Sequence, residues 1–385
     1  MSETGTVLHI IPTLDQAGAE KQLTLLAGEL KRRGWPVHVC ALTRGGFYQK
    51  VLEAAGVPVT VIGKATKLDP FAYLRLRRFL RQIRPDIVQT WLFAANAYGR
   101  WAAWRTGVPH IVGSERCADY WKSPWHFWID RFLARRSDAI VANGRYVQDF
   151  YVSHGIPRDK TVVIPNAVVE YPAGSDSRRA MLLEFGLPDE ARVIALVGRL
   201  WPQKRVEDAI WAADLLKRIR DDVHLLIIGD GPLRERLMQY RDKIEIADRV
   251  HFVGHRKDLS RWLPHFDVLW NTSAYEGQSN AVLEAMACGV PAVATDIPGN
   301  RELIVPDETG FLIPAGKGGR APLAAKTKKL LEDEDLRRRM GEAARRRARD
   351  EFSLSRMADA YCRLYEALLS RRPVPARPED EPLAV

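Results

Sequence analysis

The sequence lacks a segment that would carry it across or into a membrane. Of its 385 residues, 46% are hydrophobic, but no apolar run approaches the roughly 18 residues that a membrane-spanning helix needs. The first residues, Met-Ser-Glu-Thr-Gly-Thr, have neither the basic start nor the apolar stretch of a secretory signal. We therefore expect the protein in the cytoplasm, with cores large enough for two or three domains.

Cysteine is scarce, and the few that occur are far apart. No Cys-x-x-Cys pair or histidine cluster accompanies them, so we expect free thiols in a reducing compartment and no structural zinc. A Gly-x-Gly-x-x-Gly sequence with a downstream acid is also missing, which disfavours a nicotinamide-dependent oxidoreductase. The cysteines are Cys40, Cys117, Cys288 and Cys362.

Negative charge is in short supply in the first half of the chain. The first 170 residues contain 23 Lys and Arg against 14 Asp and Glu, whereas the remainder contains 35 against 34. Much of the excess lies in residues 64–84, where arginines alternate with apolar side chains. A second cluster is the aromatic run Tyr120–Trp128, followed by Arg131, Arg135 and Arg136. Two interpretations stay open, amphipathic helices with solvated basic faces or a surface that docks on anionic lipid, while no motif points to nucleic acid.

Short β-branched runs alternate with helical patterns along the chain. Uninterrupted apolar strands between helices are typical of parallel sheets covered on both faces. The alternation stops at a stretch with Pro, Gly and Ser and then restarts, so we predict an α/β protein of two Rossmann-like domains facing across a cleft. The predicted strands are Val7–Ile11, Val37–Ala41, Val59–Ile62, Asp86–Gln89, His110–Val112, Ala139–Ala142, Thr161–Ile164, Val193–Val197, Leu225–Ile228, Val250–Val253, Val268–Trp270 and Ala292–Thr295.

These patterns divide the chain into five parts. Residues 1–170 form the first Rossmann-like domain, residues 171–187 a linker, and residues 188–352 the second domain. Residues 353–371 form a C-terminal helix, and residues 372–385, rich in Pro and charge, are expected to be disordered. Because ligands of such sheets bind at the carboxyl ends of the strands, we expect the functional residues in the loops that follow the strands.

One segment, Ala274–Pro291, carries two glutamates eight residues apart. Glu276 lies in the loop after a predicted strand, and Glu284 lies about one turn inside the helix that follows. Between them, Ser279, Asn280 and the backbone amides at the helix start are a natural place for a phosphate. An anion site flanked by two carboxylates, Glu276 and Glu284, is the arrangement expected for binding a sugar nucleotide.

Two cations follow the first strand of the second domain. Gly198 begins a turn at the end of Val193–Val197, and Arg199 and Lys204 come next, five residues apart. The Arg fork and the mobile Lys make a phosphate clamp, although the pair alone also fits two surface cations on an exposed loop. In the first domain, Gly18 begins a helix directly after a strand, where backbone can approach a ligand.

The run Asp333-Glu334-Asp335 formally matches an Asp-x-Asp metal motif. It lies between basic helical segments and follows no apolar strand, so we predict a solvated helix junction instead. Arg199, Lys204 and the helix dipole then balance a diphosphate, and neither a divalent ion nor another cofactor is required.

The run from Glu276 through Gly-Gln-Ser-Asn-Ala-Val-Leu to Glu284, continued by Ala-Met-Ala-Cys-Gly-Val-Pro, resembles the signature of glycosyltransferase family 4. That family has the GT-B fold and a motif of two glutamates separated by seven residues. The agreement extends over about residues 6–370 and is specific in the second half and looser in the first, as expected where the acceptor binds. The further matching runs are Gly198-Arg-Leu200 with Lys204, Gly229-Asp-Gly-Pro232, Val163-Ile-Pro-Asn166 and Ala17-Gly-Ala-Glu20.

The resemblance implies a role for each matching residue. Glu284 would hydrogen-bond the ribose, and Glu276 would hold the transferred sugar. It also implies retention of anomeric configuration, independence of metal, acceptor binding in the first domain, donor binding in the second, and a last helix that crosses back to the first. The expected catalytic residues are Arg199, Lys204 and Glu276, and the expected donor-binding residues are Gly18, Gly198, Gly277, Ser279, Asn280, Ala281 and Glu284.

The chain departs from the family pattern at two places. Ala17 stands where the first glycine of a pair is usual, and Trp91 and Ala94 stand where family members often carry His. Neither of the latter replaces a histidine in proton transfer, which puts in doubt any mechanism that needs it. The residues we expect on the acceptor side are Trp91, Asn96, Glu115 and Arg116.

The sequence thus predicts a retaining glycosyltransferase that moves a sugar from a nucleotide-diphosphate sugar to a hydroxyl of a glycan or lipid-linked acceptor. The expected setting is the synthesis of cell-surface polysaccharide, lipopolysaccharide or glycolipid, with peripheral binding to the inner face of the plasma membrane. Two alternatives stay open: a catalytically inactive, sugar-nucleotide-binding partner of a glycan assembly complex, and a sugar-nucleotide epimerase or sugar phosphorylase of the same fold.

Overall fold

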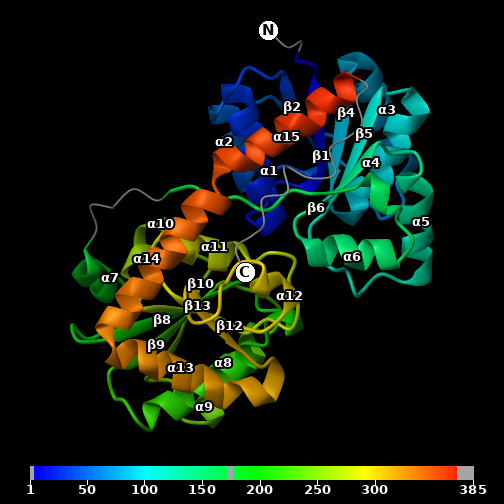
Figure 1. The fold of residues 1–385 in the computed structure, drawn as a ribbon. Coiled ribbons are helices and arrows are strands. Elements are labelled where there is room, and N and C mark those ends of the chain that lie inside the picture. The colour runs from blue at the N-terminus through cyan, green and yellow to red at the C-terminus, as the bar shows by residue number, and fades with distance from the viewer. Residues whose placement is uncertain (1–3, 171–176, 371–385) are drawn as a thin grey trace. The chain divides into compact units, whose positions relative to one another are not determined.

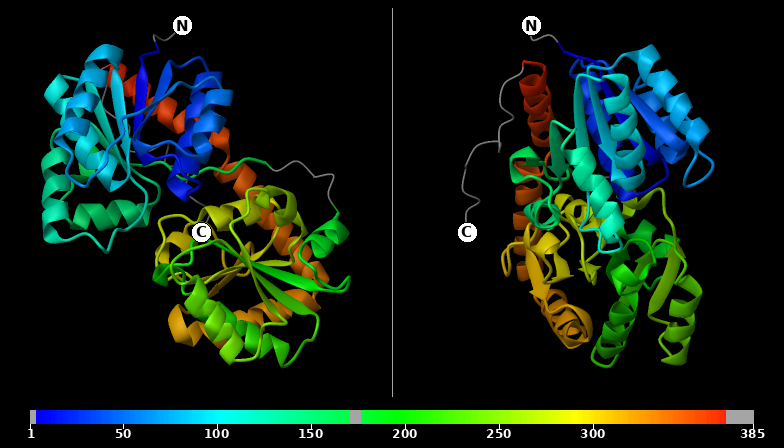
Figure 2. Two further views of the ribbon diagram at one scale, coloured as in Figure 1. Left: turned by 180° about the vertical axis from the view of Figure 1, so that it is seen from behind. Right: turned by 90° about the vertical axis from the view of Figure 1, so that its right-hand side faces the viewer.

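The computed structural model describes residues 4–170 and 177–370, which form two compact units (Figure 1). Unit 1 combines the chain up to Ala167 with the segment from Leu354 onward, and unit 2 is Val168–Ser353. Each unit is a parallel sheet with helices on both faces (Figure 2). The predicted α/β class and the two Rossmann-like domains are confirmed.

Unit 1 contains a seven-stranded sheet in the order β3-β2-β1-β4-β5-β6-β7. Every neighbouring pair is parallel, and the order reverses between β1 and β4, which is the switch point where open α/β sheets bind ligands. The strands are β1 (Val7–Thr13), β2 (Val37–Arg44), β3 (Val59–Val61), β4 (Ile87–Trp91), β5 (His110–Glu115), β6 (Ala139–Ala142) and β7 (Thr161–Val163).

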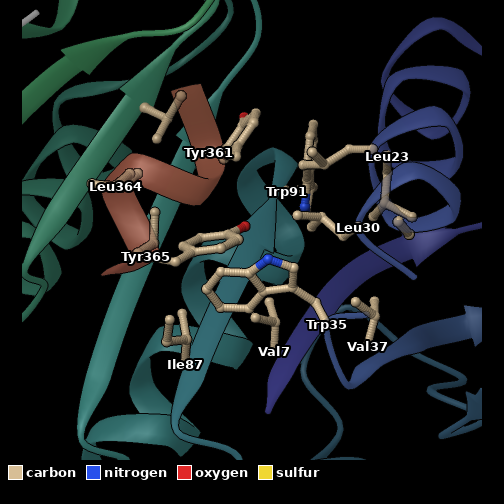
Figure 3. Close-up of a cluster of buried hydrophobic side chains, with 14 of the residues drawn as sticks. Val7, Leu23, Leu30, Trp35, Val37, Ile87, Trp91, Tyr361, Leu364 and Tyr365 are labelled. Carbon is tan, nitrogen blue, oxygen red and sulfur yellow. The ribbon is translucent and has the colours of Figure 1, made fainter. Parts of the chain in front are cut away.

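The helices of unit 1 include the last helix of the chain. α15 packs beside α1, and its Tyr361 and Tyr365 are fully buried against Trp35 and Trp91 (Figure 3). The core of unit 1 is therefore completed by residues more than 200 positions away in the chain. The helices are α1 (Gly18–Arg32), α2 (Phe47–Ala54), α3 (Pro70–Ile83), α4 (Leu92–Thr106), α5 (Pro124–Ala134), α6 (Arg145–Ser153) and α15 (Leu354–Leu369).

Unit 2 repeats this plan with a six-stranded parallel sheet in the order β10-β9-β8-β11-β12-β13. Its switch point lies between β8 and β11, so the loops that follow these two strands meet at one edge. The strands are β8 (Arg192–Val197), β9 (Val223–Ile228), β10 (Val250–Gly254), β11 (Val268–Asn271), β12 (Ala292–Thr295) and β13 (Gly310–Ile313).

The helices of unit 2 begin and end at residues whose chemistry accounts for the boundary. Asp333 caps α14, because its carboxylate accepts a hydrogen bond of 2.8 Å from the Leu336 amide. The predicted helix junction at Asp333–Asp335 is confirmed. The helices are α7 (Arg178–Glu184), α8 (Val206–Lys217), α9 (Arg234–Lys243), α10 (Leu259–Trp262), α11 (Asn280–Ala287), α12 (Pro298–Arg301), α13 (Arg320–Glu332) and α14 (Glu334–Glu351).

All twelve predicted strands are present, with ends shifted by up to three residues. One strand, β13, was not predicted, because Gly310–Ile313 begins with a glycine and follows a turn of polar residues. The four cysteines are free thiols. Within the described ranges no helix is both long and apolar enough to span a bilayer. The predicted tail, residues 372–385, and part of the predicted linker lie outside the described residues.

Candidate active site

Two loops of unit 2 are joined by hydrogen bonds at the carboxyl ends of β8 and β11. Thr272 donates its hydroxyl proton to the Lys204 carbonyl at 2.7 Å. The Ala274 amide donates to the Gln203 carbonyl at 2.8 Å, and the Gln203 side chain donates to the Tyr275 carbonyl at 2.7 Å. The loop with the predicted clamp is therefore held against the loop with the first glutamate.

The centre of this arrangement is an ion pair between Lys204 and Glu276. Lys204 Nζ donates to Glu276 Oε1, and the same oxygen accepts a hydrogen bond of 2.7 Å from Ser273 Oγ. The Lys204 side chain is 19% exposed and that of Glu276 is 11% exposed. Gly198 lies under the lysine stem, because a Cβ there would be 3.2 Å from Lys204 Cε. A partly buried ammonium is thus held in one place with N–H donors left for a further acceptor.

The helix α11 begins directly beside this pair. Ser279 is its N-cap and accepts a hydrogen bond from the Val282 amide, while Asn271 donates to Ser279 Oγ at 3.0 Å. The helix ends before Gly289, whose φ of 73° is the left-handed conformation that favours glycine after a helix. Glu284 lies one turn inside α11 and is partly exposed. The helix start therefore presents amides and a fixed hydroxyl next to the lysine.

Two further segments, α12 and the turn after β9, contact the loops of Glu276 and Gly198 through glycines. A Cβ at Gly299, in α12, would lie 2.2 Å from the Gly277 carbonyl oxygen, so only glycine allows α12 to approach the Glu276 loop this closely. In the Gly229-Asp-Gly-Pro turn, a Cβ at Gly231 would lie 2.6 Å from the Leu200 carbonyl oxygen. The Leu200 amide also donates to the Asp230 carbonyl at 2.9 Å. That turn therefore supports the loop of Gly198.

The second cation of the predicted clamp is arranged differently from the first. Arg199 is exposed, and its guanidinium lies 5.6 Å from the ring centroid of Trp201, which is 48% exposed. Within the described part of the chain, no carboxylate lies within salt-bridge distance of Arg199. Arg199 is thus an exposed surface cation, whereas Lys204 is paired and partly buried.

The structure brings most of the predicted donor-binding residues together in unit 2. They occupy the loop after β8, the loop after β11 and the first turns of α11. Gly18 belongs to unit 1, where it is the first residue of α1 directly after the loop that follows β1. The roles of these residues stay predictions. The residues gathered in unit 2 are Gly198, Arg199, Lys204, Glu276, Gly277, Ser279, Asn280, Ala281 and Glu284.

On the predicted acceptor side, Trp91 is a core residue. It is fully buried, its indole N–H donates to His9 Nδ1 at 3.2 Å, and it packs against Tyr361 with ring centroids 6.4 Å apart. Burial lowers the pKa of His9 to about 3, so the imidazole is neutral. Because Nδ1 accepts from Trp91, the proton of His9 lies on Nε2. Trp91 thus occupies the position where members of the family often carry a histidine, and its hydrogen-bond partner is a different, buried histidine, His9.

Asn96 and Glu115 are buried in a network of charged side chains. Asn96 Nδ2 donates to Glu115 Oε1 at 2.9 Å, and Lys122 Nζ lies 3.4 Å from Glu115 Oε2 and 2.9 Å from Asp130. Arg100 pairs with Asp130 at 3.0 Å. We call the five charged residues the buried charge network; they are Arg100, Glu115, Asp119, Lys122 and Asp130.

The buried charge network contains three carboxyl groups but only two cations. Burial raises the pKa of Glu115 to about 7, and the nearby Lys122 charge opposes this rise. The neighbouring carboxylates of Asp130 and Asp119 raise it further. A proton on Glu115 makes the network neutral, which is the favoured state of buried charges. Of the four residues predicted on the acceptor side, Arg116 alone is partly exposed.

Several residues of these two sites had no signal in the sequence. Ser273 precedes the recognised motif and is one of many serines, and Lys122 and Asp130 lie in an aromatic run that resembles a surface helix. Asp130 occupies a position on α5 that faces inward, as the spacing from the buried Phe127 and Ala134 indicates. The spacing of Asp130 from Phe127 and Ala134 is therefore the one feature of the sequence that could have indicated a buried carboxylate on this helix.

A fold of two Rossmann-like units with a cation, a carboxylate and a helix N-terminus at one switch point defines the class of GT-B glycosyltransferases. Models of known families match both halves of the chain. The model described as glycosyl transferases group 1 matches residues 178–347, and that of glycosyltransferase family 4 matches residues 17–170.

Known proteins agree with this classification. A GDP-mannose-dependent alpha-mannosyltransferase of Mycolicibacterium smegmatis is 31% identical over 342 residues, which cover 82% of this chain and 83% of that protein. A lipopolysaccharide core biosynthesis glycosyltransferase of Rhizobium meliloti is 25% identical and covers 93% and 97% of the two chains. The crystal structure of Anabaena HepE in complex with UDP-glucose superposes with a TM-score of 0.83 at 22% identity, covering 95% of this chain and all of that one. The chain belongs to glycosyltransferase family 4.

Proposed function

We propose that this glycosyltransferase transfers a sugar from a nucleotide-diphosphate sugar to a hydroxyl acceptor with retention of anomeric configuration. The observation that carries the proposal is the Lys204–Glu276 pair beside the start of α11. A relative named as GDP-mannose-dependent and a neighbour crystallised with UDP-glucose support a nucleotide sugar as the donor. A relative named for lipopolysaccharide core biosynthesis supports a role in building polysaccharide, lipopolysaccharide or glycolipid.

In the proposed mechanism, the bond between the anomeric carbon and the phosphate loosens first. The sugar becomes oxocarbenium-like, and the departing diphosphate gains negative charge. Lys204, Arg199 and the amides at the start of α11 stabilise that charge, and each such contact is typically worth about 3–4 kcal/mol in the transition state. The acceptor hydroxyl attacks the same face of the sugar, and the departing phosphate takes its proton. Glu276 holds the sugar, and Glu284 binds the ribose.

We further propose that the transfer needs no metal ion. Its support is the positive charge already present at the site, one paired lysine and one exposed arginine beside a helix N-terminus. Turnover should therefore be the same in buffer treated with a chelator and in buffer supplemented with Mg²⁺ or Mn²⁺. A strict requirement for either ion would contradict this part of the proposal.

The test of the donor site compares Lys204→Ala and Arg199→Ala with Lys243→Ala, an exposed lysine at the end of α9. We expect the first two changes to lower turnover by about 10²–10³-fold and the control to have no effect. A loss below about tenfold for both variants would refute the assignment. Nucleotide binding without turnover across an acceptor panel would favour the inactive partner, and release of nucleoside diphosphate only when an acceptor is present would exclude the epimerase and the sugar phosphorylase.

We also propose that the enzyme is cytoplasmic and binds an anionic membrane surface, such as the inner face of the plasma membrane. Helices α4 and α5 carry one continuous stack of aromatic rings: Trp125 on Trp128 at 4.8 Å, Trp128 on Phe132 at 5.7 Å, and Phe132 on Trp101 at 5.5 Å. Arg136 lies 3.6 Å from the Phe132 ring centroid. We call Trp101, Trp104, Trp125, Trp128, Phe132 and Arg136 the aromatic–arginine surface.

The charges around the aromatic–arginine surface favour a lipid partner. Four of its tryptophans are between 36% and 63% exposed, and the single acid of α4 and α5, Asp130, is buried in the charge network. Helix α3 lies beside α4 (Figure 1) and adds exposed arginines with exposed Phe71 and Leu74. Tryptophan with arginine is the composition of membrane-interface surfaces, and a surface of one charge sign would repel a second copy of itself.

Vesicle co-sedimentation tests the membrane proposal. The protein should sediment with vesicles containing phosphatidylglycerol and much less with pure phosphatidylcholine, since each basic residue near an anionic surface adds about 1 kcal/mol. Trp125→Ala with Trp128→Ala should weaken this binding, and Trp201→Ala, an exposed tryptophan of unit 2, should not. Equal binding to both vesicle types would count against the proposal.

A further inference from the structure

Arg116 lies at the carboxyl edge of the sheet in unit 1. Four strands have a polar or aromatic residue at or shortly after their last residue there. Trp91 is the last residue of β4, Arg116 follows β5 directly, and Asn143 follows β6 directly. Asn166 comes three residues after the end of β7. Because open parallel sheets bind their ligands at this edge, these residues are placed to meet a ligand of unit 1.

The guanidinium of Arg116 is held in a fixed orientation. Its Cζ lies 4.9 Å from the ring centroid of Trp91, and its Nη2 donates to Asn166 Oδ1. Trp91 is itself fixed by its hydrogen bond to His9 and by the packing of Tyr361 from α15 (Figure 3). The guanidinium is held by an aromatic ring and an amide before any ligand arrives. It therefore loses little further conformational freedom when it binds a planar or tetrahedral oxyanion.

The same guanidinium lacks a counter-charge. Nη1 of Arg116 is buried, and the group beside the guanidinium is the neutral hydroxyl of Tyr361, which opposes the fall in its pKa but supplies no negative charge. No described carboxylate lies within salt-bridge distance of Arg116. Asn143 Oδ1 and His9 Nε2, from neighbouring strand ends and β1, are buried and unpaired within the described part of the chain. Burial disfavours the charged form of Arg116 and lowers its pKa, yet an arginine stays charged.

Arg100 shows what this fold does with an arginine that has only a structural role. Its side chain is 2% exposed, and Asp130 lies 3.0 Å away as a buried partner. A buried cation without such a partner is costly, so the absence of an acid near Arg116 among the residues that the structure describes points to a negative charge supplied by a bound ligand. Arg116 is also partly exposed, which Arg100 is not.

We propose that Arg116, braced by Trp91 and Asn166, binds an oxyanion of the acceptor, so that the acceptor carries a phosphate or carboxylate group. The proposal rests on the proposed function in one respect, that unit 1 receives the acceptor. The chemistry shared by both anions is an oxygen pair that the N–H fork of arginine matches in geometry and charge. The structure thereby assigns a substrate class to the acceptor that no motif in the sequence specifies.

The direct test measures binding of inorganic phosphate and of acetate to the full chain by calorimetry, with the donor site of unit 2 disabled by Lys204→Ala. We expect one weak site for one of the two probes, and this distinguishes a phosphate acceptor from a carboxylate acceptor. Arg116→Gln should weaken that binding at least about tenfold, as loss of a charge-assisted bidentate contact predicts. Arg158→Gln, an exposed arginine of unit 1 paired with Asp149, should leave it unchanged. No binding of either probe, or equal binding to Arg116→Gln, would overturn the proposal.

Stability measurements separate a ligand-binding arginine from a structural one. Arg100→Gln should lower the melting temperature because it leaves Asp130 with one partner fewer. Arg116→Gln should lower it by less, because the loss of the contacts with Trp91 and Asn166 is offset by the removal of a cation that has no counter-charge. A fall in melting temperature for Arg116→Gln as large as for Arg100→Gln would show a structural role and contradict the proposal.

A transfer assay distinguishes failure of this proposal from failure of the proposed function. Matched acceptors with and without a phosphate ester or carboxylate should differ in KM with the wild-type enzyme, and Arg116→Gln should raise KM for the anionic member alone. Equal use of both acceptors by the wild type would refute the anionic acceptor while leaving the glycosyltransferase intact. Binding of the anion without any binding of a sugar nucleotide would instead refute the proposed donor chemistry.

Discussion

At the scale of single residues, Lys122 connects the buried charge network of unit 1. Its Nζ lies 2.9 Å from Asp130, 3.4 Å from Glu115 and 3.5 Å from Asp119, and it donates to Tyr151 Oη at 2.8 Å. The Lys122 side chain has no exposed surface. The network therefore fixes the loop that carries the exposed Tyr120 and Trp121.

Glu115 makes the stability of the protein depend on pH. Its folded-state pKa is raised from 4.5 to about 7, so its contribution is complete below the unfolded pKa and is lost as the pH rises through 7. Relative to Glu115→Gln, the wild-type free energy of unfolding should fall between pH 4.5 and about pH 7, by up to about 1.4 kcal/mol per pH unit. Urea denaturation of both proteins at several pH values measures this difference. A difference that grows with rising pH would show that Glu115 is ionised in the folded state.

At the scale of elements, the two switch-point loops of unit 2 depend on glycines that admit a neighbouring backbone. Gly229 directly follows β9 with a φ of 142°, and a Cβ there would lie 1.9 Å from the Gly198 carbonyl oxygen. The turn after β9 therefore sets the position of the turn after β8, from which Lys204 reaches Glu276. Close backbone contacts therefore help to place the lysine.

Gly229→Ala should displace the Gly198 turn and weaken donor binding. We expect a loss of about 1–3 kcal/mol in stability from the strained conformation and the clash, together with lower nucleotide affinity. The control is Gly318→Ala, because Gly318 is exposed, lacks a positive φ and has open space around it, and it should change stability by less than about 0.5 kcal/mol. Thermal unfolding and calorimetry measure the two effects, and equal behaviour of the variants would disprove the argument from the clash.

At the scale of the whole molecule, the chain returns to its first unit after completing the second. α15 contributes Met357, Ala360, Tyr361, Leu364, Tyr365 and Leu368 to the core of unit 1. Tyr365 also donates a hydrogen bond to Gln89, inside the sheet. Unit 1 therefore cannot be complete until the last helix has been made.

A chain that ends after Ser353 should retain unit 2 and lose the ordered core of unit 1. Removing six buried residues of α15 exposes apolar surface of α1 and β4, and each lost large side chain typically costs about 2–5 kcal/mol. Hydrogen exchange should show rapid exchange in β1 and β4 and normal protection in β8 and β11. A chain that ends after Ser370 keeps α15 and serves as the control. Full protection of β1 in the shorter chain would contradict the expectation.

The sequence by itself determined the parts of this protein that local patterns encode. Strand and helix periodicity located twelve of the thirteen strands that the described residues form, β6 and β12 to the residue, because those patterns depend only on neighbours in the chain. The Glu276–Glu284 run and the Lys204 loop could be recognised for the same reason. β13 was missed because Gly310–Ile313 begins with a glycine and directly follows a run of polar residues.

The tertiary structure decided how these parts meet. Lys204 pairs with Glu276 across 72 residues, and Trp91 is covered by a tyrosine from α15, neither of which any local pattern encodes. The same holds for the absence of a described acid beside Arg116 and its presence beside Arg100. Charge and burial are properties of surroundings, and only the packing of distant segments supplies them. The placement of the Lys204 and Glu276 loops at one edge of a sheet was therefore predictable from the sequence, whereas the burial of Trp91, Asn96 and Glu115 emerged from the fold.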